Sequence, residues 1–362
     1  MTPVRSLLLY AVGADNRTMS YQQGWPRHFQ RHAHFSCTSI NVADRRMSAR
    51  LRAHLLVRRD RYDAVVLLHS VFSNACMVGQ RLLEALARVP APKAYFIGNE
   101  YKLMPEKMAF SEALGVSLLI SQTDSAAVHR LYRERLGCSV VGVPNTGLDP
   151  ELFRPRTLVA ERPIDLGYRA TEGPEYLGHD ERRRIADFFL AHAERYRLQV
   201  DISTRPEDRF TESAWADFLD RCKGQLGTEA GSDYFELTDQ RRRAINAYLE
   251  TGRGVSPDEI FERFFATATR VPIRILSGRN VEAAGTKTVQ ILFEGRYGGY
   301  LEPDVHYIPL RKDLSDADVA IEKFRDTEFR AKLVDNAYAV AIGELTYTRL
   351  IDRFYAALAP LL

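Results

Sequence analysis

Short apolar segments recur along the first part of this chain, and each of them ends in polar residues before a helical stretch begins. Runs of β-branched and apolar residues of this length are typical of strands that are buried on both faces. Strands and helices that alternate at this spacing predict an α/β fold with a parallel, doubly wound sheet. The strands expected in this part are residues 6–13, 62–69, 93–100, 116–121 and 139–143.

The same alternation continues in the second part of the chain, where strands are expected at 164–169, 200–203 and 288–293. Between the two parts, residues 144–155 contain three prolines and a glycine, which cannot continue a helix or a central strand. A chain of 362 residues is long for one domain and natural for two. The expected lobes are residues 1–155 and 156–345.

The composition is that of a soluble globular protein, with 45% apolar and 27% charged residues. A formal net charge of +3 is too small to indicate a nucleic-acid partner. The cysteines are far apart and form no CxxC or Cys/His cluster, so we expect reduced thiols and no structural zinc. No apolar run approaches the ~20 residues that span a bilayer, and no signal peptide is apparent. The sequence therefore predicts a cytoplasmic protein.

Residues 45–61 form the most basic segment of the chain, with seven arginines against Asp44 and Asp60. Leucine and valine side chains between the arginines predict a basic amphipathic helix. Such a helix can dock on the inner face of an anionic membrane or on a lipid-linked acceptor. The alternative, which we favour, is a solvated outer helix of an α/β lobe. The arginines are Arg45, Arg46, Arg50, Arg52, Arg58, Arg59 and Arg61.

Residues 277–310 predict a short helix, a buried strand, a polar loop and a second strand. Glu282 opens the helix, and the small residues at 283–285 let the backbone approach another layer or a ligand closely. The strand at 288–293 delivers Glu294 to its carboxyl end, which is where ligands bind in open α/β sheets. A carboxylate at a helix start beside a glycine-rich loop suits a ribose hydroxyl pair and a phosphate. This stretch therefore predicts the main binding site.

Residues 224–233 form a second glycine-rich stretch, which we interpret as a loop. Its backbone amides can face an anion, and Glu229 places one carboxylate in the loop beside Gly227 and Thr228. In the first part of the chain, polar residues at the ends of the expected strands predict a cleft. A histidine or glutamate there can act as a base or orient a hydroxyl group, although His69 has the alternative of a hydrogen-bonded structural role. The cleft candidates are His69, Asn99 and Glu100.

Two stretches of the chain resemble a known family. Residues 143–155 match the pattern Val-Pro-Asn-x-Gly-Leu-Asp-x-x-x-Phe-x-Pro, which resembles the interdomain signature of GT-B glycosyltransferases. Asn145 and Gly147 fit that signature and would lie at the mouth of the cleft. Residues 277–310 resemble the donor half of these enzymes, closest to bacterial members related to the retaining family-four enzymes (glycosyl transferases group 1). The resemblance implies two Rossmann-like lobes with parallel sheets facing a central cleft, and a final helix at 346–362 that crosses back to the first lobe.

The resemblance also implies roles for individual residues. Glu282 would hold the nucleotide ribose, and Arg169 would bind the diphosphate. The family motif has a second glutamate seven residues before Glu282, and this chain has Ile275 there. Residues 234–270 look like a helical insertion, so Glu229 is expected in place of that glutamate, with a capping or structural role as the alternative. The other expected donor-binding residues are Gly227, Thr228, Arg279, Thr286, Lys287 and Glu294.

The function implied by the resemblance is transfer of a sugar from a nucleoside-diphosphate donor to the hydroxyl group of a glycan, a lipid-linked molecule or a small molecule. We expect retention of configuration, a role in bacterial polysaccharide biosynthesis, and no metal or cofactor beyond the donor itself. Arg169 and Lys287 would stabilise the leaving diphosphate. The acceptor proton would pass to a side chain, with Glu229, His69 and Glu100 as the catalytic candidates, or to the leaving phosphate.

Two alternatives use the same fold. One is a nucleotide-sugar epimerase, which needs an acid/base cluster that the sequence does not show. The other is a protein that binds a nucleotide or glycan without catalysis, which the loss of the first motif glutamate at Ile275 leaves open. Asp316 and Asp318 spell the DxD pattern of metal-dependent transferases. Acidic residues in the first turn of a helix also complement its dipole, so we expect a helix start there and no metal site.

Overall fold

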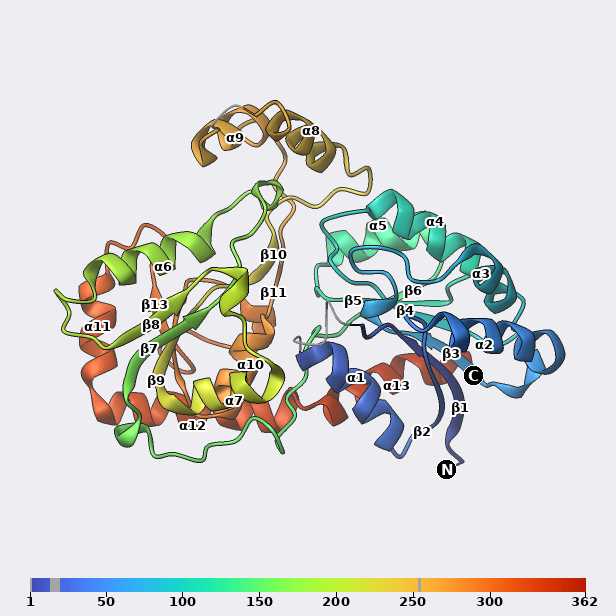
Figure 1. Cartoon of the computed structure of the whole chain (residues 1–362), viewed down its shortest axis with the longest axis horizontal. Coiled ribbons are helices and arrows are strands. Elements are labelled where there is room, and N and C mark those ends of the chain that lie inside the picture. The colour runs from blue at the N-terminus through green and yellow to red at the C-terminus, as the bar shows by residue number, and fades with distance from the viewer. Residues whose placement is uncertain (1, 14–19, 253–254) are drawn as a thin grey trace.

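The computed structural model describes residues 2–13, 20–252 and 255–362, and it shows two α/β lobes side by side (Figure 1). Residues 14–19, which follow the first expected strand, lie outside the described residues, as do residues 253–254 of the predicted insertion. Within the described parts, no helix is both long and apolar enough to cross a membrane.

The first lobe contains a sheet of six parallel strands in the order β2-β1-β3-β4-β5-β6. The strand order reverses between β1 and β3, which opens a crevice at their carboxyl ends. The strands are β1 (Val4–Tyr10), β2 (Phe35–Asn41), β3 (Ala64–Leu67), β4 (Lys93–Phe96), β5 (Leu118–Ser121) and β6 (Ser139–Gly142).

Helices cover both faces of this sheet because alternate strand residues are apolar on each side. Leu7 and Leu9 pack with the helices of one face, whereas Leu8 packs with those of the other. The first face is covered by α2 (Arg45–Arg58), α3 (Gln80–Ala87), α4 (Met104–Leu114) and α5 (Ala126–Leu136), and the second by α1 (Ser20–Arg31) and α13 (Tyr347–Leu358).

The second lobe contains five parallel strands in the order β13-β12-β9-β7-β8, which reverses between β7 and β9. The strands are β7 (Ile164–Arg169), β8 (Val200–Ser203), β9 (Cys222–Gly227), β12 (Val289–Phe293) and β13 (Ile308–Leu310). Helices α6 (Glu181–His192) and α11 (Ala317–Arg325) pack on one face, α7 (Glu212–Arg221) and α10 (Gly278–Gly285) on the other, and α12 (Thr327–Glu344) lies against α10 and α11. Short 3-10 helices lie at Arg59–Arg61, His69–Val71, Val159–Glu161, Glu175–Leu177, Pro206–Asp208, Tyr297–Gly299 and Ala359–Leu361.

The interpretation of residues 224–233 as an anion-binding loop is wrong, because Cys222–Gly227 is β9, a central strand of the second sheet. Its glycines serve close packing. A Cβ atom on Gly224 would lie 2.7 Å from Cε2 of Phe324, and one on Gly227 would lie 2.7 Å from Cδ2 of Leu292. A strand rich in glycine lacks the β-branched residues by which the other strands were recognised.

An arm extends from the second lobe above the cleft (Figure 1). It begins and ends with the antiparallel strands β10 (Ala230–Ser232) and β11 (Ile273–Ile275) and contains α8 (Gln240–Leu249) and α9 (Pro257–Phe264). The arm contacts the first lobe, since Oδ2 of Asp239 accepts a hydrogen bond of 3.0 Å from the backbone nitrogen of Leu103. A nitrogen of Arg243 also lies 2.8 Å from a carboxylate oxygen of Glu106.

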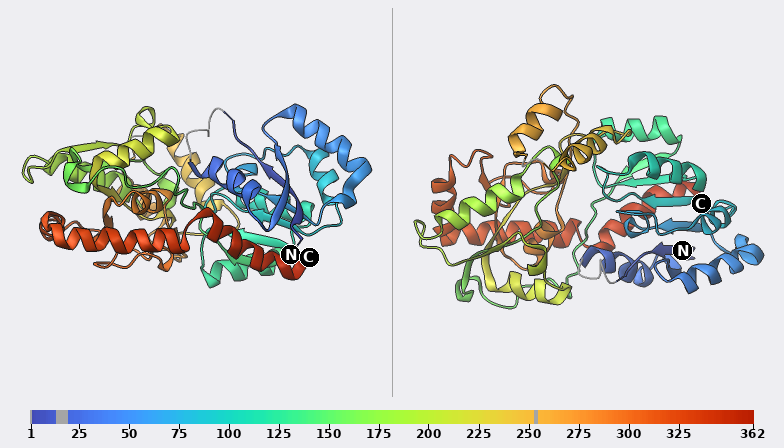
Figure 2. Two further views of the ribbon diagram at one scale, coloured as in Figure 1. Left: turned by 90° about the horizontal axis from the view of Figure 1, so that it is seen from below. Right: turned by 45° about the horizontal axis from the view of Figure 1, so that its top comes forward.

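The chain crosses between the lobes a second time below the cleft, where α12 and α13 run along the lower side of the molecule (Figure 2). The backbone of Leu148 pairs with that of Leu345 and Tyr347 at this crossing. Gly147 lies directly under the ring of Tyr347, because a Cβ atom on this glycine would lie 2.7 Å from the ring. The glycine that resembles the interdomain signature therefore makes room for the start of α13.

Candidate active site

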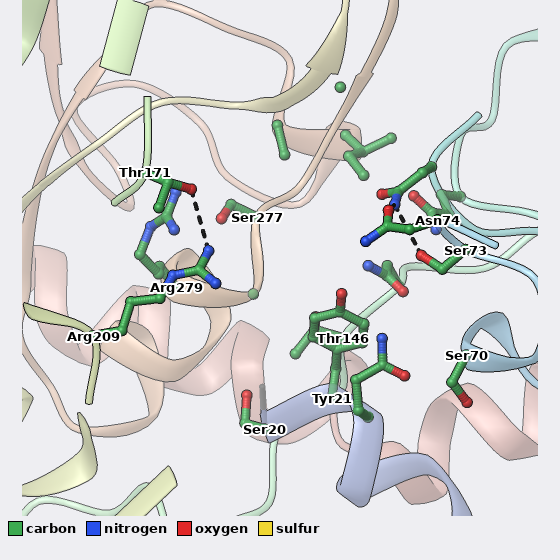
Figure 3. Close-up of a pocket in the computed structure, with 18 of the residues that line it drawn as sticks. Ser20, Tyr21, Ser70, Ser73, Asn74, Thr146, Thr171, Arg209, Ser277 and Arg279 are labelled. Carbon is green, nitrogen blue, oxygen red and sulfur yellow. Dashed lines mark hydrogen bonds between the residues drawn. The ribbon is translucent and has the colours of Figure 1, made fainter. Parts of the chain in front are cut away.

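A cavity of about 740 Å³ lies between the lobes, where the carboxyl ends of strands from both sheets meet. Ser70 follows β3 and Asn99 follows β4 on the first-lobe wall, and Thr171 follows β7 on the opposite wall. The volume is that of a site for a small organic ligand. Figure 3 shows the polar side chains of the two walls facing each other across this space.

Three guanidinium groups line the second-lobe wall without a carboxylate partner among the described residues: Arg182, Arg209 and Arg279. Nη1 of Arg182 donates to the backbone oxygen of Thr171 at 3.4 Å, and Nη2 of Arg209 donates to Oγ1 of Thr171 at 3.2 Å (Figure 3). The guanidinium of Arg279 lies over the ring of Tyr168, 5.9 Å from its centre.

The three arginines are close enough to repel one another. Burial lowers the pKa of Arg279, and the charges of Arg182 and Arg209 lower it further, while Tyr168 and Glu282 act in the opposite direction. A guanidinium remains charged at neutral pH in any such environment, so the wall holds an excess of positive charge. A bound anion with several acceptor oxygens, such as a diphosphate, relieves this repulsion and accepts paired hydrogen bonds.

The N-terminus of α10 adds to this anion site. Ser277 and Gly278 line the cavity, and the side chain of Ser277 does not cap the helix. The first backbone N–H groups of a helix have no partner within the helix and carry a partial positive charge. Gly278 lets this end approach the first lobe, since a Cβ atom there would lie 2.7 Å from Oγ1 of Thr146.

Arg169 lines the cavity, but its guanidinium is already engaged. Nη2 of Arg169 lies 2.6 Å from Oδ1 of Asp201, and Nη1 donates to the backbone oxygens of Tyr168 and Asp201, both at 2.9 Å. The group also stacks over the rings of Phe210 and Phe218. Arg169 therefore lines the cavity with its charge already paired to Asp201, whereas the other three arginines have no described carboxylate partner.

Glu282 lines the cavity from α10, with only 3% of its surface exposed. Oε2 of Glu282 accepts a hydrogen bond of 2.8 Å from Nε1 of Trp215, and Oε1 accepts one from the hydroxyl of Ser20 in the first lobe. Burial raises the pKa of Glu282 to about 7, although the two hydrogen bonds oppose this. The carboxylate expected to hold a ribose thus links the two lobes.

Ile275 lines the cavity at the position of the missing motif glutamate. It pairs with Ala230 across β10 and β11, so the arm does bring Glu229 next to this position. The side chain of Glu229, however, turns away from the cavity, and its Oε1 accepts hydrogen bonds from the backbone nitrogens of Arg296 at 3.1 Å and Tyr297 at 2.7 Å. Neighbouring strand residues point to opposite sides, so Ala230 faces the ligand space and Glu229 holds the loop after β12.

The other residues expected in donor binding lie outside the cavity wall. Thr286 and Lys287 follow the C-terminal end of α10, about 12 Å along the helix from the end that faces the cavity. Lys287 pairs there with Asp335, at 2.7 Å between Nζ and Oδ1. Glu294 is exposed beyond β12. Thr228 is buried and donates to the backbone oxygen of Glu229.

Polar side chains line the first-lobe wall after the end of β4, and the ammonium group of Lys102 is among them. The side-chain nitrogen of Asn99 donates to Oγ of Ser73 and to Oδ1 of Asn74, both at 2.8 Å. Asn145 also lines the cavity, and its Oδ1 is buried without a hydrogen-bond partner among the described residues. Amide and hydroxyl groups of this kind suit the hydroxyl groups of a sugar or an acceptor.

His69 and Glu100 lie behind this wall rather than in it. Both ring nitrogens of His69 are buried without a partner among the described residues, and burial lowers the pKa of His69 to about 3. Glu100 accepts hydrogen bonds from Ser121, Gln122 and Tyr132 and is also fully enclosed. Neither side chain lines the cavity, so both lie away from the space in which a catalytic role was expected for them.

The sequence did not identify Arg182 and Arg209 as residues that line the cavity beside Arg279. Arg182 begins a run of three arginines, a pattern that is more typical of a solvated helix face, but the first turn of α6 faces the cavity. Arg209 follows β8, so the rule that ligands meet the carboxyl ends of strands could have nominated it. The DxD pattern of Asp316 and Asp318 lies at the start of α11, where a helix start was expected. The described residues contain no group of three or more His, Cys, Asp or Glu side chains that could hold a metal ion.

No protein-family model and no curated protein sequence matches this chain. Its structure is similar to that of HepE from Anabaena in complex with UDP-glucose, with 12% identity and a TM-score of 0.52 over 99% of this chain and 100% of the other. A glycosyltransferase from Rickettsia africae has 10% identity and a TM-score of 0.56, covering 100% and 99% of the two chains. The sucrose-phosphate synthase of Thermosynechococcus elongatus has 11% identity and a TM-score of 0.52, covering 99% of each chain. The expected fold class is thus confirmed: the chain has the GT-B fold, with two Rossmann-like lobes on either side of a central cleft.

Proposed function

We propose that this protein is a glycosyltransferase that moves a sugar from a nucleoside-diphosphate donor to a hydroxyl group of an acceptor. The observation that carries the proposal is the wall formed by Arg182, Arg209 and Arg279, none of which forms an ion pair with a described carboxylate, beside the N-terminus of α10. This wall suits a diphosphate. Glu282 lies close enough to Arg279 for its charge to raise the pKa of that arginine. One solved structure with the same fold, that of HepE, contains UDP-glucose, which agrees with a nucleoside-diphosphate sugar as the ligand.

The chemistry that we propose follows from these charges. The leaving diphosphate gains negative charge as the glycosidic bond breaks, and the three guanidinium groups stabilise it where a metal ion would in other enzymes. The sugar passes through an oxocarbenium-like state. Because Glu229, His69 and Glu100 do not line the cavity, we assign the acceptor proton to the leaving phosphate. Attack on the face that the phosphate leaves retains the configuration of the sugar, as the resemblance to the family-four enzymes implies.

We propose that the donor lies against the second lobe and the acceptor against the first. The amide and hydroxyl groups around Asn99, and the oxygen of Asn145 that has no partner among the described residues, support this arrangement because they can bond to sugar hydroxyls. Glycan assembly, as expected from the resemblance, is the process that such an enzyme would serve.

A second candidate function is binding of a nucleotide sugar without transfer. Ile275 favours it, because an apolar side chain lies where the family has a glutamate that contacts the donor sugar. Binding requires only the arginine wall and Glu282, whereas transfer also requires the sugar to be held toward the acceptor. The two candidates are separated by whether a transfer or hydrolysis product forms.

Thermal denaturation with UDP, GDP, ADP, CMP and dTDP, each with and without magnesium, tests nucleotide binding. A ligand at about 100 times its dissociation constant adds ~2.7 kcal/mol to the free energy of unfolding. We expect one nucleoside diphosphate to raise the melting temperature, and we expect the rise to be the same in magnesium and in EDTA. The corresponding sugar nucleotide is then incubated with the protein, and release of nucleoside diphosphate is measured with and without candidate acceptors.

Arg279→Gln provides the test variant and Arg88→Gln the control. Arg88 is an exposed arginine at the end of α3 that does not line the cavity. We expect Arg279→Gln to abolish most of the nucleotide stabilisation and Arg88→Gln to leave it unchanged. If no nucleoside diphosphate stabilises the protein, or if both variants respond like the parent, the arginine wall is not a donor site and the proposed function fails.

A further inference from the structure

A groove of about 690 Å³ lies between α2 and α3 on the first lobe. Ala43 and Met77 line both this groove and the interlobe cavity, so the two spaces meet at these residues. Figure 1 shows α2 and α3 side by side on the first lobe. A molecule in the cleft can therefore extend into the groove without leaving the protein surface.

The groove is lined by arginines from both helices. Arg45 and Arg52 lie seven residues apart on one face of α2, with Ser48 and Ala49 between them on the same face. Arg81 lies in the first turn of α3. None of the three forms an ion pair with a described carboxylate, and no Asp or Glu is among the described residues that line the groove.

The N-terminal end of α3 also points into this groove. Gly79 is the N-cap residue, and it lines the groove together with Gln80. The backbone N–H groups of Gln80 and Arg81 donate to no acceptor among the described residues. Free amides at a helix start attract anions, and here they are accompanied by three guanidinium groups within one groove.

We propose that this groove binds a phosphate group carried by the acceptor, and that the acceptor hydroxyl then lies in the adjoining cleft. The inference rests on the proposed glycosyl transfer. Phosphate fits because the planar fork of a guanidinium donates two hydrogen bonds to two phosphate oxygens. The apolar side chains of Met77 and Leu82 offer contact to the uncharged part of the same molecule. The acceptor class is thus a phosphorylated hydroxyl compound.

The arginines of the basic segment at 45–61 fall into two sets, one that lines the groove and one that does not. Arg45 and Arg52 line the groove, whereas Arg58, Arg59 and Arg61 lie at the far end of the segment, exposed and outside it. A general attraction of α2 to anionic surfaces would use both sets alike. A specific phosphate site in the groove uses the first set alone. Variants that remove the same number of charges from each set therefore distinguish the two possibilities.

The experiment compares three variants of the full chain. The groove variant is Arg45→Gln/Arg52→Gln/Arg81→Gln, the charge-matched control is Arg58→Gln/Arg59→Gln/Arg61→Gln, and the cleft variant is Arg209→Gln/Arg279→Gln. Binding of glycerol 3-phosphate is measured by phosphorus NMR line broadening, and binding of vesicles with and without phosphatidic acid by co-sedimentation. The soluble probe and the vesicles distinguish a water-soluble phosphomonoester from a lipid headgroup.

We expect the groove variant to bind the probe at least about tenfold more weakly than the parent, with the control variant within about twofold of it. Binding of either probe that follows this pattern supports the groove and identifies the source of the phosphate. Equal losses in the groove and control variants, a loss in the cleft variant alone, or no binding by the parent overturn the inference. Nucleoside diphosphates are tested on the same variants: if they stabilise all but the cleft variant while the phosphate test fails, only the acceptor inference falls. If they stabilise none, the proposed function fails, and any phosphate binding is then a property of the groove alone.

Discussion

The buried carboxyl group of Glu282 makes a prediction about stability and pH. Burial raises the pKa of Glu282 to about 7, from an ordinary value of 4.5. The difference of about 2.5 between these values corresponds to about 3 kcal/mol, at ~1.4 kcal/mol for each pKa unit. Because the pKa is higher in the folded state, the contribution is fully present below about pH 4.5 and is lost as the pH rises through about 7.

Glu282→Gln removes this titration with little change of shape. The amide oxygen of glutamine can accept the hydrogen bond from Trp215, and its NH₂ group can donate to the hydroxyl oxygen of Ser20, whose proton is free to rotate. We expect the variant to have nearly the stability of the parent at pH 5 and to exceed it by up to about 3 kcal/mol at pH 8. Nucleotide binding should nevertheless weaken in the variant, because a carboxylate is the better acceptor for ribose hydroxyls.

Urea unfolding at half-unit steps between pH 4.5 and pH 8 measures this difference. The parent and variant share every other titrating group, including the buried Glu100, so their difference isolates Glu282. Glu322→Gln, on the exposed side of α11, is the control and should follow the parent at every pH. If the stabilities of parent and Glu282→Gln run parallel from pH 5 to pH 8, this carboxyl group does not occupy the buried position described above.

Three further outcomes are expected, each measured by urea unfolding. Gly147→Ala should cost about 1–3 kcal/mol because its methyl group would overlap the ring of Tyr347, whereas Gly343→Ala, which meets no atom within 4 Å at the end of α12, should be neutral or add up to about 1 kcal/mol. Lys107→Met should cost about 3 kcal/mol or more, since its ammonium group donates to three backbone oxygens of the loop that holds Asn99, and an unchanged stability would contradict those contacts. Asp239→Ala should cost about 1–2 kcal/mol and speed hydrogen exchange at the first-lobe amide that it binds; protection equal to the parent would refute the contact.

The fold could be predicted because its signals are local. Most strands of both sheets are continuous apolar runs that end in polar residues, and the proline-rich segment at 144–155 divides the two lobes. The strand β9 was not predicted, because the residues that require glycine at 224 and 227 are distant from them in the sequence. Only the packed structure shows that Phe324 and Leu292 leave no room for larger side chains there.

The candidate site could be predicted only in part, because burial and pairing decide which charged groups are free. Arg169 and Arg182 are both arginines close to the carboxyl end of β7, and their sequence contexts do not reveal that Asp201 neutralises only the first. Likewise, the sequence places Glu229 beside the missing glutamate, but the direction of its side chain depends on the pleat of β10. A one-residue difference in strand register separates a ligand contact from a loop support.

The contacts below the cleft bury more apolar side chains than those above it. Below, α13 buries Leu350, Ile351, Phe354 and Leu358 completely against the first lobe, at about 1.5–3 kcal/mol for each side chain. Above, the arm packs Phe235 and Ile273 into the core cluster of the first lobe, with Leu237 and Val271 partly buried beside them. The described residues of the arm add a hydrogen bond from Leu103 to Asp239 and an exposed ion pair, which is worth about 0–1 kcal/mol.

This imbalance determines how the cleft can open. If the lobes separate to admit a ligand, we expect the contacts of the arm to break before those of α13, because α13 buries more apolar surface against the first lobe. The arm is continuous with β10 and β11, whose residues Ala230 and Ile275 line the cavity. A donor that packs against these two residues therefore steadies the base of the arm and favours the closed cleft. We therefore expect the arm to couple occupancy of the donor side to the contact between the lobes.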